Sequence, residues 1–335
     1  MLNFDFRPYT RPFQQPLRNH HGEWSIRLGI LLRLEDGNGR IGWGEIAPLD
    51  FFGSESINQA LKFCQSLPSR IMAEHIGQIP QSLPACQFGF ESAWEQLQFY
   101  GCSNSDRAGN QQSPPTSILL PTGTAALESP QLFVAGTNPE STTFKWKIGV
   151  APIEAELEVF EQLVSLLPAG AKLRLDANGG LSWQQADQWL RVCDGYGIEY
   201  LEQPLPPDQF DLMLKLSQRH ETPIALDESV ATLNQLQTCY QQNWHGIFVI
   251  KAPIVGSPIQ LRNFCQTHRL DIVWSSVFET PVARRYIETH LVATLPAGRA
   301  TGFGVKHWFR DRWEEDSAQQ LWQRLSTNPL RTTHR

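Results

Sequence analysis

The chain has 335 residues, of which 41% are hydrophobic, and its formal net charge is −6 at pH 7. A chain of this length predicts about two domains and a substantial buried core. The acidic balance argues against a nucleic-acid or anionic-membrane surface, for which an excess of basic residues is expected. No apolar run approaches the roughly 18 residues of a membrane span, and the first residues lack an apolar signal core, so secretion is not expected.

The six cysteines are scattered along the chain, and none forms a Cys-x-x-Cys pair. A zinc cluster or a redox-active dithiol is therefore not expected. In a chain of this size, free thiols indicate a reducing compartment, so we expect a cytoplasmic protein. The sequence leaves open whether the protein is a monomer or a homo-oligomer.

The first 100 residues predict an α+β domain. The apolar segment Trp24–Leu34 is followed by strong turn residues at Asp36–Gly39 and then by Ile41–Glu45. This order predicts a β-hairpin. Apolar residues at helical spacing predict helices over Ser56–Leu67 and Phe88–Tyr100.

Residues 101–116 are polar and rich in Gly, Ser and Asn, with a double proline near their end, which predicts a linker. Over residues 117–305, eight short apolar runs alternate with amphipathic stretches such as Ile153–Leu167 and Trp183–Cys193. This alternation predicts a parallel sheet closed into a barrel. An open doubly wound sheet is the rival, but no Gly-x-Gly-x-x-Gly follows the first strand. We expect residues 306–335 to pack back on the first domain.

Five charged residues end successive apolar runs of the second domain. They lie 29, 26, 25 and 24 residues apart, which is about one strand, one helix and two loops each time. They are Lys147, Asp176, Glu202, Asp227 and Lys251. A charge inside a buried strand is costly, whereas the C-terminal ends of barrel strands are where enzymes of this architecture keep their chemistry. The spacing therefore predicts a fold and a site together.

Three of these residues, Asp176, Glu202 and Asp227, predict a site for a hard divalent cation. Mg²⁺ prefers oxygen ligands and keeps positions open for water or substrate, and Mn²⁺ is the alternative. No Cys or His joins the three, so zinc and copper are disfavoured. Alternatively, each of the three carboxylates could be an ordinary helix cap or a member of a salt bridge. This explanation is disfavoured because all three lie at the ends of predicted strands. Glu228 is a weaker ligand candidate, because strict alternation places it on the opposite face.

Lys145 and Lys147 are two residues apart on one predicted strand, so their side chains share a face. Two ammonium groups that point into a barrel repel each other, and we expect Lys145 to lower the pKa of Lys147 toward neutrality. A neutral lysine is a competent general base. We expect Lys251 to approach from the opposite wall. The alternative for Lys145 and Lys147 is that they lie on a solvated edge strand. The aromatic and β-branched residues beside them disfavour this alternative.

Four further residues are candidates for substrate binding. Arg174 and Asn178 lie two residues before and after Asp176, so all three share a face. Arg174 could bind a substrate carboxylate or order the carboxylate ligands, and the sequence leaves both open. Ser275 and Ser276 end the seventh strand candidate, where hydroxyl and N–H groups could hold a second carboxylate, although turn-forming serines are just as common.

The ordered set Lys-x-Lys, Leu-Asp-Ala-Asn, Glu-Gln-Pro, Leu-Asp-Glu-Ser and Val-Ile-Lys resembles the enolase superfamily, and most of all its muconate-lactonizing subgroup. The resemblance covers most of the chain, and it implies a modified TIM barrel of the (β/α)7β type with an N-terminal α+β capping domain. Trp43–Leu49 looks like part of that capping domain and Ser117–Gly123 like the first barrel strand. Where the subgroup often has Glu-Glu-Pro, this chain reads Glu-Gln-Pro, and the last strand lacks the Asp-x-Asp usual in dipeptide epimerases.

Within the subgroup, the short chain, the first strand and Ser275–Glu279 are similar to the dehydratases of menaquinone and phylloquinone biosynthesis. The resemblance implies Mg²⁺-dependent syn dehydration of 2-succinyl-6-hydroxy-2,4-cyclohexadiene-1-carboxylate to o-succinylbenzoate. Lys147 would remove the proton α to the carboxylate, and Lys251 would stay cationic against the ring or the enediolate. The loops near Arg18–Glu23 and Asp50–Ser54 would close over the succinyl tail and exclude water.

Three other functions fit parts of the same pattern. Two opposed lysines suit proton exchange on two faces, so a racemase of N-acylamino acids or an epimerase of dipeptides is the main alternative. Lys147 or Lys251 could instead form a Schiff base in a class I aldolase. The non-enzymatic alternative is a barrel that binds a carboxylate together with a metal and carries out no chemistry.

Overall fold

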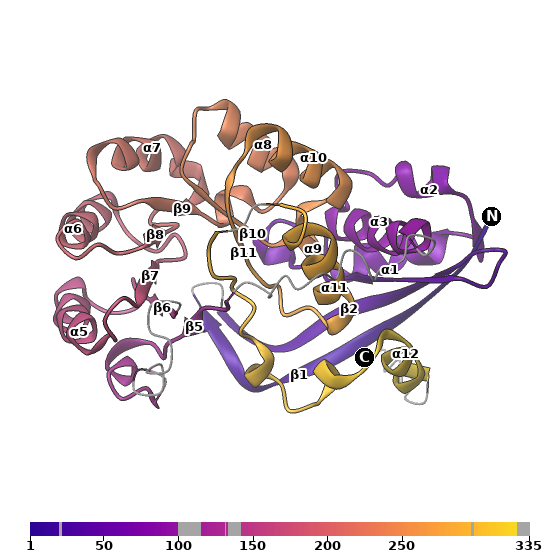
Figure 1. Cartoon of the computed structure of the whole chain (residues 1–335), viewed down its shortest axis with the longest axis horizontal. Helices are drawn as coiled ribbons and strands as arrows, with labels where there is room; N and C mark the ends of the chain where they lie inside the picture. Colours follow the sequence, from indigo (N-terminus) through magenta and orange to yellow (C-terminus); the bar gives the residue numbers. More distant parts are fainter. Residues whose placement is uncertain (20–21, 100–114, 131, 133–141, 296–297, 327–335) are drawn as a thin grey trace.

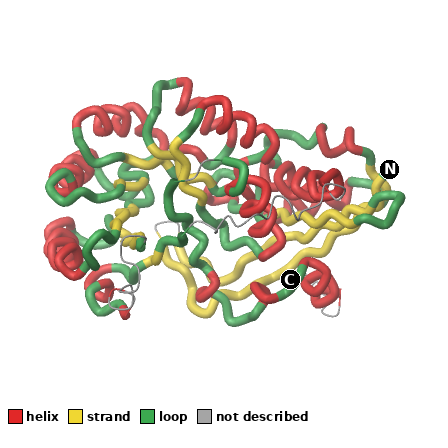
Figure 2. The backbone as a smooth tube through the Cα atoms, viewed as in Figure 1, coloured by secondary structure: helices red, strands yellow, loops and turns green. Residues whose placement is uncertain are grey.

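The structure is a computed structural model, and it describes residues 1–19, 22–99, 115–130, 132, 142–295 and 298–326. Within these residues, an antiparallel sheet of four strands and a parallel sheet of seven strands organise the chain. The antiparallel sheet lies at the end of the molecule that holds the N-terminus, and the parallel sheet lies at the other end with helices outside it (Figures 1 and 2).

The antiparallel sheet has the order β3-β2-β1-β4. Its strands are β1 (Leu2–Asn19), β2 (Gly22–Glu35), β3 (Ile41–Ile46) and β4 (Arg70–Ile71). The predicted hairpin of β2 and β3 is present, but β1 was not predicted. Pro8 and Pro12 lie within β1, and proline normally argues against a strand. They are tolerated because β4 pairs only with Leu2 and Asn3, so the rest of β1 is an edge strand.

Three helices cover one face of this sheet: α1 (Ile57–Ser66), α2 (Ala73–Gly77) and α3 (Pro84–Phe99). α3 packs directly on β3 because Gly42 and Gly44 have no side chains. A Cβ atom on Gly42 would lie 2.0 Å from the carbonyl oxygen of Ala93, and one on Gly44 would lie 2.0 Å from that of Gly89. The two glycines of the Gly-Trp-Gly segment are therefore required by backbone contact between strand and helix.

The parallel sheet follows chain order from β5 to β11. Its strands are β5 (Ile118–Leu119), β6 (Thr143–Lys147), β7 (Lys172–Asp176), β8 (Tyr200–Glu202), β9 (Ile224–Leu226), β10 (Ile247–Ile250) and β11 (Asp271–Trp274). The eighth strand candidate, Arg299–Gly304, contributes only two bridged residues. Thr301 pairs with Thr116 and Gly302 pairs with Ser275, so this segment closes the barrel between its first and last strands.

The helices that follow the barrel strands pack on the outside of the barrel (Figure 1). They are α5 (Ile153–Leu166), α6 (Trp183–Cys193), α7 (Phe210–Arg219), α8 (Leu233–Gln241), α9 (Ala252–Val255), α10 (Pro258–His268) and α11 (Pro281–Tyr286). No helix in the described ranges is long and apolar enough to cross a membrane.

Alternation along the barrel strands separates two apolar layers. Outward-facing residues such as Trp146 and Leu175 join the large core between strands and helices. Inward-facing residues such as Tyr200, Ala225 and Val249 form a small separate core inside the barrel. The inner layer is apolar beneath the strand ends, and the charged side chains of the five strand-end residues face inward above it, at the C-terminal ends of the strands.

The last described segment returns to the first domain through α12 (Ala318–Ser326). Trp313 and Trp322 pack with Tyr9 of β1 in one buried cluster, and the Arg11 guanidinium pairs with Asp311 at 2.9 Å. We propose the domain division expected from the sequence, with residues 1–100, 117–305 and 306–335 as its parts. Residues 101–114, most of the proposed linker, lie outside the described residues.

Glu45 joins the capping domain to the barrel. Its carboxylate, at the end of β3, is fully buried. It accepts hydrogen bonds from the Tyr9 hydroxyl at 2.6 Å, from the Thr280 N–H at 2.9 Å and from the Ala283 N–H at 3.2 Å. Thr280 is the N-cap residue of α11, so one side chain of the first domain satisfies donors at the start of a barrel helix.

We predict that Glu45→Ala lowers the free energy of unfolding by about 3 kcal/mol, because it leaves buried donors of both domains without an acceptor. Urea denaturation followed by circular dichroism measures the effect. Glu158→Ala, at an exposed position of α5, is the matched control and should change the value by less than about 0.5 kcal/mol. Equal stability of the two variants would contradict the role given to Glu45.

Candidate active site

The strand-end charges meet at one end of the barrel. In the register of the parallel sheet, Lys147 lies opposite Asp176, and Asp176 lies opposite Glu202. Asp227 directly follows β9 and Lys251 directly follows β10. The exposed fractions of Asp176, Glu202 and Asp227 are 2%, 0% and 3%, so three carboxylates are buried at adjacent strand ends. Buried charges of this kind require positive partners.

Three lysines provide those partners. The Lys145 ammonium lies 2.6 Å from Glu202 Oε1 and 2.9 Å from Asp176 Oδ2. The Lys147 ammonium is 3.7 Å from Asp176 Oδ2, and Lys251 donates to Asp227. The structure therefore brings together all five strand-end residues and Lys145, as expected from their phase along the strands.

Lys145 is held as a cation by its two carboxylate neighbours. Burial alone would lower its pKa, but the charges of Asp176 and Glu202 outweigh burial and raise the pKa well above its usual value. The effect that we expect Lys145 to have on Lys147 stays a prediction. Lys145 is thus a permanent cation in this structure.

The carboxyl groups differ in their electrostatic environment. Burial, together with the charge of Asp176, raises the pKa of Glu202 to about 7. Burial also raises the pKa of Asp227 to about 6, although Lys251 opposes the shift. The pKa of Asp176 is lowered despite its burial, because Lys145 and Lys147 both lie close to it. Negative charge is therefore only partly balanced at Glu202 and Asp227.

Glu228 also faces the site, so the expectation that it points to the opposite face was wrong. Its Oε1 atom accepts a hydrogen bond of 3.1 Å from Asn178 Nδ2. Strict alternation fails here because β9 ends at Leu226 and Asp227 has φ −121° and ψ −74°, after which a 3-10 turn begins. The sequence signal that could have revealed this is the brevity of the apolar run before Asp227.

Asn178 links the strand-end lysine to Glu228. The Lys147 ammonium donates to Asn178 Oδ1, and the Asn178 N–H lies 3.1 Å from Asp176 Oδ1. The backbone of Asn178 has φ 45°, a conformation that Asn tolerates better than most residues. Asn178 is thus in the cluster, where it orients the Lys147 ammonium.

Arg174 lies deeper in the barrel than the cluster. Its guanidinium pairs with Glu199 at 2.7 Å, and Arg299 pairs with the same carboxylate at 2.8 Å. Glu199 directly precedes β8, so this network lies at the N-terminal ends of the strands. The side chain of Arg174 is 1% exposed, so it is buried at the base of the barrel, below the strand-end cluster.

The two serines after β11 differ in their contacts. Ser276 Oγ is buried and bonds to Glu279 Oε2 at 2.8 Å and to Arg284 Nη2 at 3.0 Å. Ser275 is partly exposed and pairs with Gly302 at the barrel closure. Of the two, only Ser275 keeps its hydroxyl free of contacts with Glu279 and Arg284.

The loop Asp50–Ser54 of the capping domain reaches the cluster. The Lys251 ammonium lies 4.0 Å from the centre of the Phe52 ring, a distance typical of a cation–π contact. The ring of Phe51 packs edge-on against Trp24 at 5.5 Å, which anchors the loop to β2. Residues 20–21, inside the other expected capping loop, lie outside the described residues.

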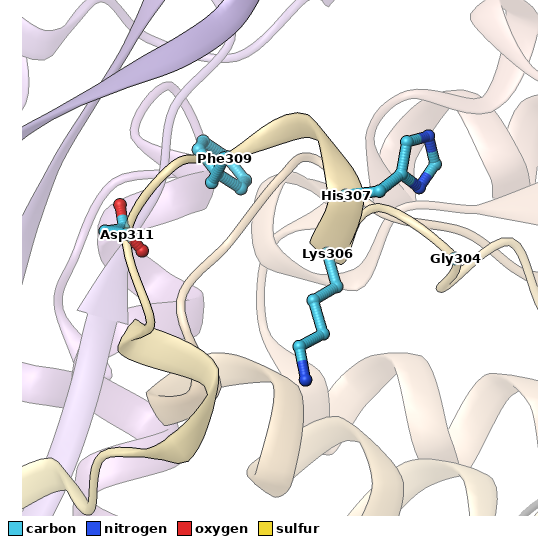
Figure 3. Close-up of a pocket in the computed structure, with 5 residues that line it drawn as sticks. All are labelled: Gly304, Lys306, His307, Phe309 and Asp311. Carbon is cyan, nitrogen blue, oxygen red and sulfur yellow. The ribbon is translucent and has the colours of Figure 1, made fainter.

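A cavity of about 460 Å³ lies beside the segment that follows the barrel closure. It is lined by Gly304, Lys306, His307, Phe309 and Asp311. Lys306 and His307 leave their short helical turn in different directions (Figure 3). None of these residues was a site candidate, because the segment has no strand periodicity. No strand-end lysine or carboxylate lines this cavity.

In the described part of the chain, no three His, Cys, Asp or Glu side chains form a ready-made metal cage. The lysine ammonium groups lie between the carboxylates instead. Two oxygens in the cluster, Oε2 of Glu202 and Oε2 of Glu228, are buried and have no hydrogen-bond partner. Buried, unpaired carboxylate oxygens are costly, so the donor set retains capacity for an additional cation.

Comparison with known proteins covers nearly the whole chain. The family model of enolase C-terminal domain-like proteins matches residues 134–324, and the model of the MenC N-terminal domain matches residues 4–97. The o-succinylbenzoate synthase of Thermosynechococcus vestitus is 41% identical over 97% of this chain and 99% of that protein. The L-Ala-D/L-Glu epimerase of Bacillus subtilis is 27% identical over 68% of this chain and 65% of that protein.

Solved structures of related enzymes also match this chain over nearly its whole length. The crystal structure of o-succinylbenzoate synthase from Thermosynechococcus elongatus, complexed with Mg in the active site, matches with a TM-score of 0.85 and 40% identity. The match covers 96% of this chain and 99% of that one. The substrate-liganded L-Ala-D/L-Glu epimerase of Bacillus subtilis matches with a TM-score of 0.75 and 19% identity over 92% and 90% of the two chains, which shows a shared fold.

We predict that Lys145→Met lowers the free energy of unfolding by about 3 kcal/mol in EDTA, because it leaves Asp176 and Glu202 buried without their shared cation. Urea denaturation measures the loss. Lys215→Met, at an exposed position of α7, should be nearly neutral. If the two variants unfolded at the same urea concentration, Lys145 would not be the structural counter-ion of this cluster.

Proposed function

The chain belongs to the o-succinylbenzoate synthase family of the enolase superfamily, and from this membership we propose how its own residues carry out the reaction. The activity is that of a Mg²⁺-dependent carbon–oxygen lyase of menaquinone or phylloquinone biosynthesis. It dehydrates 2-succinyl-6-hydroxy-2,4-cyclohexadiene-1-carboxylate to o-succinylbenzoate. The observation that carries the assignment of residues is the row of Lys147, Asp176 and Glu202 in register, with Asp227 and Lys251 on the next strand ends.

The residues present fit a divalent cation. Four carboxyl groups (Asp176, Glu202, Asp227 and Glu228) lie beside three lysine ammonium groups in the described cluster, and two carboxylate oxygens lack a partner. We propose that Asp176, Glu202 and Asp227 hold the ion, since hard cations take carboxylate oxygens. When bound, Mg²⁺ supplies the positive charge that offsets the negative charge developing on the substrate carboxylate.

Lys147 is proposed as the base. Its side chain is 29% exposed, compared with 18% for Lys145 and 12% for Lys251, so it is the most accessible of the three to a substrate. As a neutral amine, Lys147 takes the proton from the carbon α to the carboxylate, and the electron pair of that C–H bond moves onto the carboxylate. When the pair returns to the ring, the C–O bond to the hydroxyl group breaks. The ammonium of Lys147 donates its proton to the departing oxygen on the same face, which gives water and an aromatic ring.

Lys251 is proposed to remain charged throughout. Asp227 pairs with it, and the Phe52 ring covers one side of its ammonium. A cation held in this way can lie against the ring or the enediolate of the substrate without exchanging a proton. This division of roles favours dehydration over racemisation, which needs a second lysine that exchanges protons. It also disfavours a Schiff-base aldolase, because that chemistry needs a neutral, unpaired amine.

We propose that Asn178 and Ser275 are the substrate-contacting members of the earlier set, because both stand at strand ends of the site. Arg174 and Ser276 would act through Glu199 and Glu279, with which they are paired. We further propose a cytoplasmic location for an enzyme that acts on a small-molecule substrate. Five described cysteines are free and buried, which agrees with a reducing compartment.

The reaction itself is tested with purified protein. With Mg²⁺, the diene absorbance of the cyclohexadiene substrate should disappear as the ring becomes aromatic, and EDTA should stop this. Incubation of an N-acylamino acid in D₂O distinguishes the racemase alternative, which would place deuterium at the α position. Absence of dehydration between about pH 6 and 9 with metal present would refute the proposed function.

We predict that Lys147→Ala lowers kcat by at least about 10²-fold, because the acid–base group of both proton transfers is lost. Steady-state kinetics at saturating Mg²⁺ measure this, while the Mg²⁺ affinity should stay within about threefold of the wild type. Lys172→Ala, at the exposed start of β7, should leave kcat unchanged. A Lys147→Ala variant that retained more than about a tenth of kcat would exclude Lys147 as the base.

We predict that Asp227→Asn weakens Mg²⁺ binding by at least about tenfold, because one negative charge of the ligand set is removed. Isothermal titration calorimetry of the protein with MgCl₂ measures the dissociation constant without a catalytic readout. Asp208→Asn, at an exposed position before α7, should bind Mg²⁺ like the wild type. Unchanged affinity in Asp227→Asn would remove Asp227 from the ligand set.

A further inference from the structure

Gln203 is a fully buried polar residue that directly follows Glu202. Its backbone has φ 37°, in the left-handed region that residues other than glycine seldom adopt. A buried residue whose backbone is kept in this conformation must be held there by the surrounding contacts. It belongs to none of the roles assigned above, since it carries no charge and is not exposed to a substrate.

The side-chain amide of Gln203 uses its full hydrogen-bonding capacity. Oε1 accepts from the Asp227 N–H at 2.9 Å and from the Ser229 N–H at 3.2 Å. Nε2 donates to Ser229 Oγ at 2.7 Å and to the Leu205 carbonyl at 2.9 Å. Two acceptor and two donor interactions satisfy an amide completely. The pattern also determines its orientation, because a flipped amide would place its oxygen against the Leu205 carbonyl.

The backbone of Gln203 extends the same connection to a third strand end. Its carbonyl accepts from the Gly179 N–H at 2.7 Å, and its N–H donates to the Ala225 carbonyl at 2.8 Å. Gly179 lies in the loop after β7, three residues beyond Asp176. One residue therefore joins the segments that directly follow Asp176 and Glu202 to the segment that contains Asp227.

We propose that Gln203 is a positioning residue for the divalent-cation site, and that it sets the place of Asp227 relative to Glu202. The proposal rests on the proposed function, because it takes these carboxylates as the ligand set. The Asp227 backbone has no strand ladder to hold it, since β9 ends one residue earlier. The hydrogen bond from its N–H to Gln203 supplies that constraint, and Ser229 repeats it two residues later. Supporting groups of this kind hold ligands in binding geometry.

Gln203→Met is the sharpest test, because it keeps the length of the side chain and removes both the acceptor and the donor contacts of the amide. The N–H groups of Asp227 and Ser229 would then lose their acceptor, so the segment that carries Asp227 would shift. We expect the Mg²⁺ dissociation constant to rise about 10- to 100-fold by calorimetry. The stabilisation of the variant by MgCl₂ in thermal melts should fall accordingly. At saturating Mg²⁺, kcat should recover to within about threefold of the wild type, as expected for a defect in metal binding.

Gln241→Met is the matched control. Gln241 is the last residue of α8 and its side chain is exposed. This variant should keep wild-type Mg²⁺ affinity and melting temperature. Ser229→Ala is a second probe of the same contact, which removes only the hydroxyl partner of Nε2. Its Mg²⁺ dissociation constant should rise about threefold, in line with the loss of one hydrogen bond.

The outcomes separate this proposal from the proposed function. If Gln203→Met melts at a lower temperature but binds Mg²⁺ like the wild type, its role is only structural and the proposal is overturned. If Gln203→Met does not fold, unchanged Mg²⁺ affinity in Ser229→Ala overturns it in the same way. If the wild-type protein does not bind Mg²⁺, or Asp227→Asn binds it normally, the ligand set itself fails, and the proposal fails with it.

Discussion

Burial of several carboxylates at one end of a barrel is the constraint on which this structure depends. Glu202 and Asp227 are almost inaccessible to solvent, and an isolated buried carboxylate would take up a proton instead of remaining charged. Lys145 prevents this for Asp176 by lying within 2.9 Å of it. The carboxyl groups of the cluster outnumber its ammonium groups, so the raised pKa values of Glu202 and Asp227 and the unpaired oxygens of Glu202 and Glu228 are the expected response of a site that accommodates one more positive charge.

The fold supplies the geometry that this charge cluster requires. Parallel pairing places Lys147, Asp176 and Glu202 in one row, and the apolar inner layer beneath them excludes water from below. The capping domain covers the other side, where Phe52 contacts Lys251. Glu45 ties that domain to the start of α11 with several hydrogen bonds, so the cover is a fixed part of the site. Preorganised charges in a water-poor site act more strongly on developing charge than they would in water.

The sequence predicted what depends on periodicity and failed where periodicity stops. Charges at the ends of apolar runs identified the strand-end cluster, because β-strand alternation is regular up to the last residue. Glu228 was misplaced because the chain leaves the strand at Asp227. The role of Arg174 could not be chosen from sequence, since its partner Glu199 comes from the next strand. β1 was missed because its prolines are compatible only with an edge strand, and edge position is a property of the assembled sheet.

The three lysines show how similar side chains in one cluster acquire different tasks through their neighbours. Lys145 contacts two carboxylates, whose charges raise its pKa. Lys251 is the least exposed of the three, and its ammonium lies between Asp227 and an aromatic ring. Lys147 is 3.7 Å from its nearest carboxylate partner and bonds to the neutral Asn178. An amine that serves as a base must give up its proton before it can accept another, and the weakest ion pairing in the cluster belongs to the lysine with the greatest access to substrate.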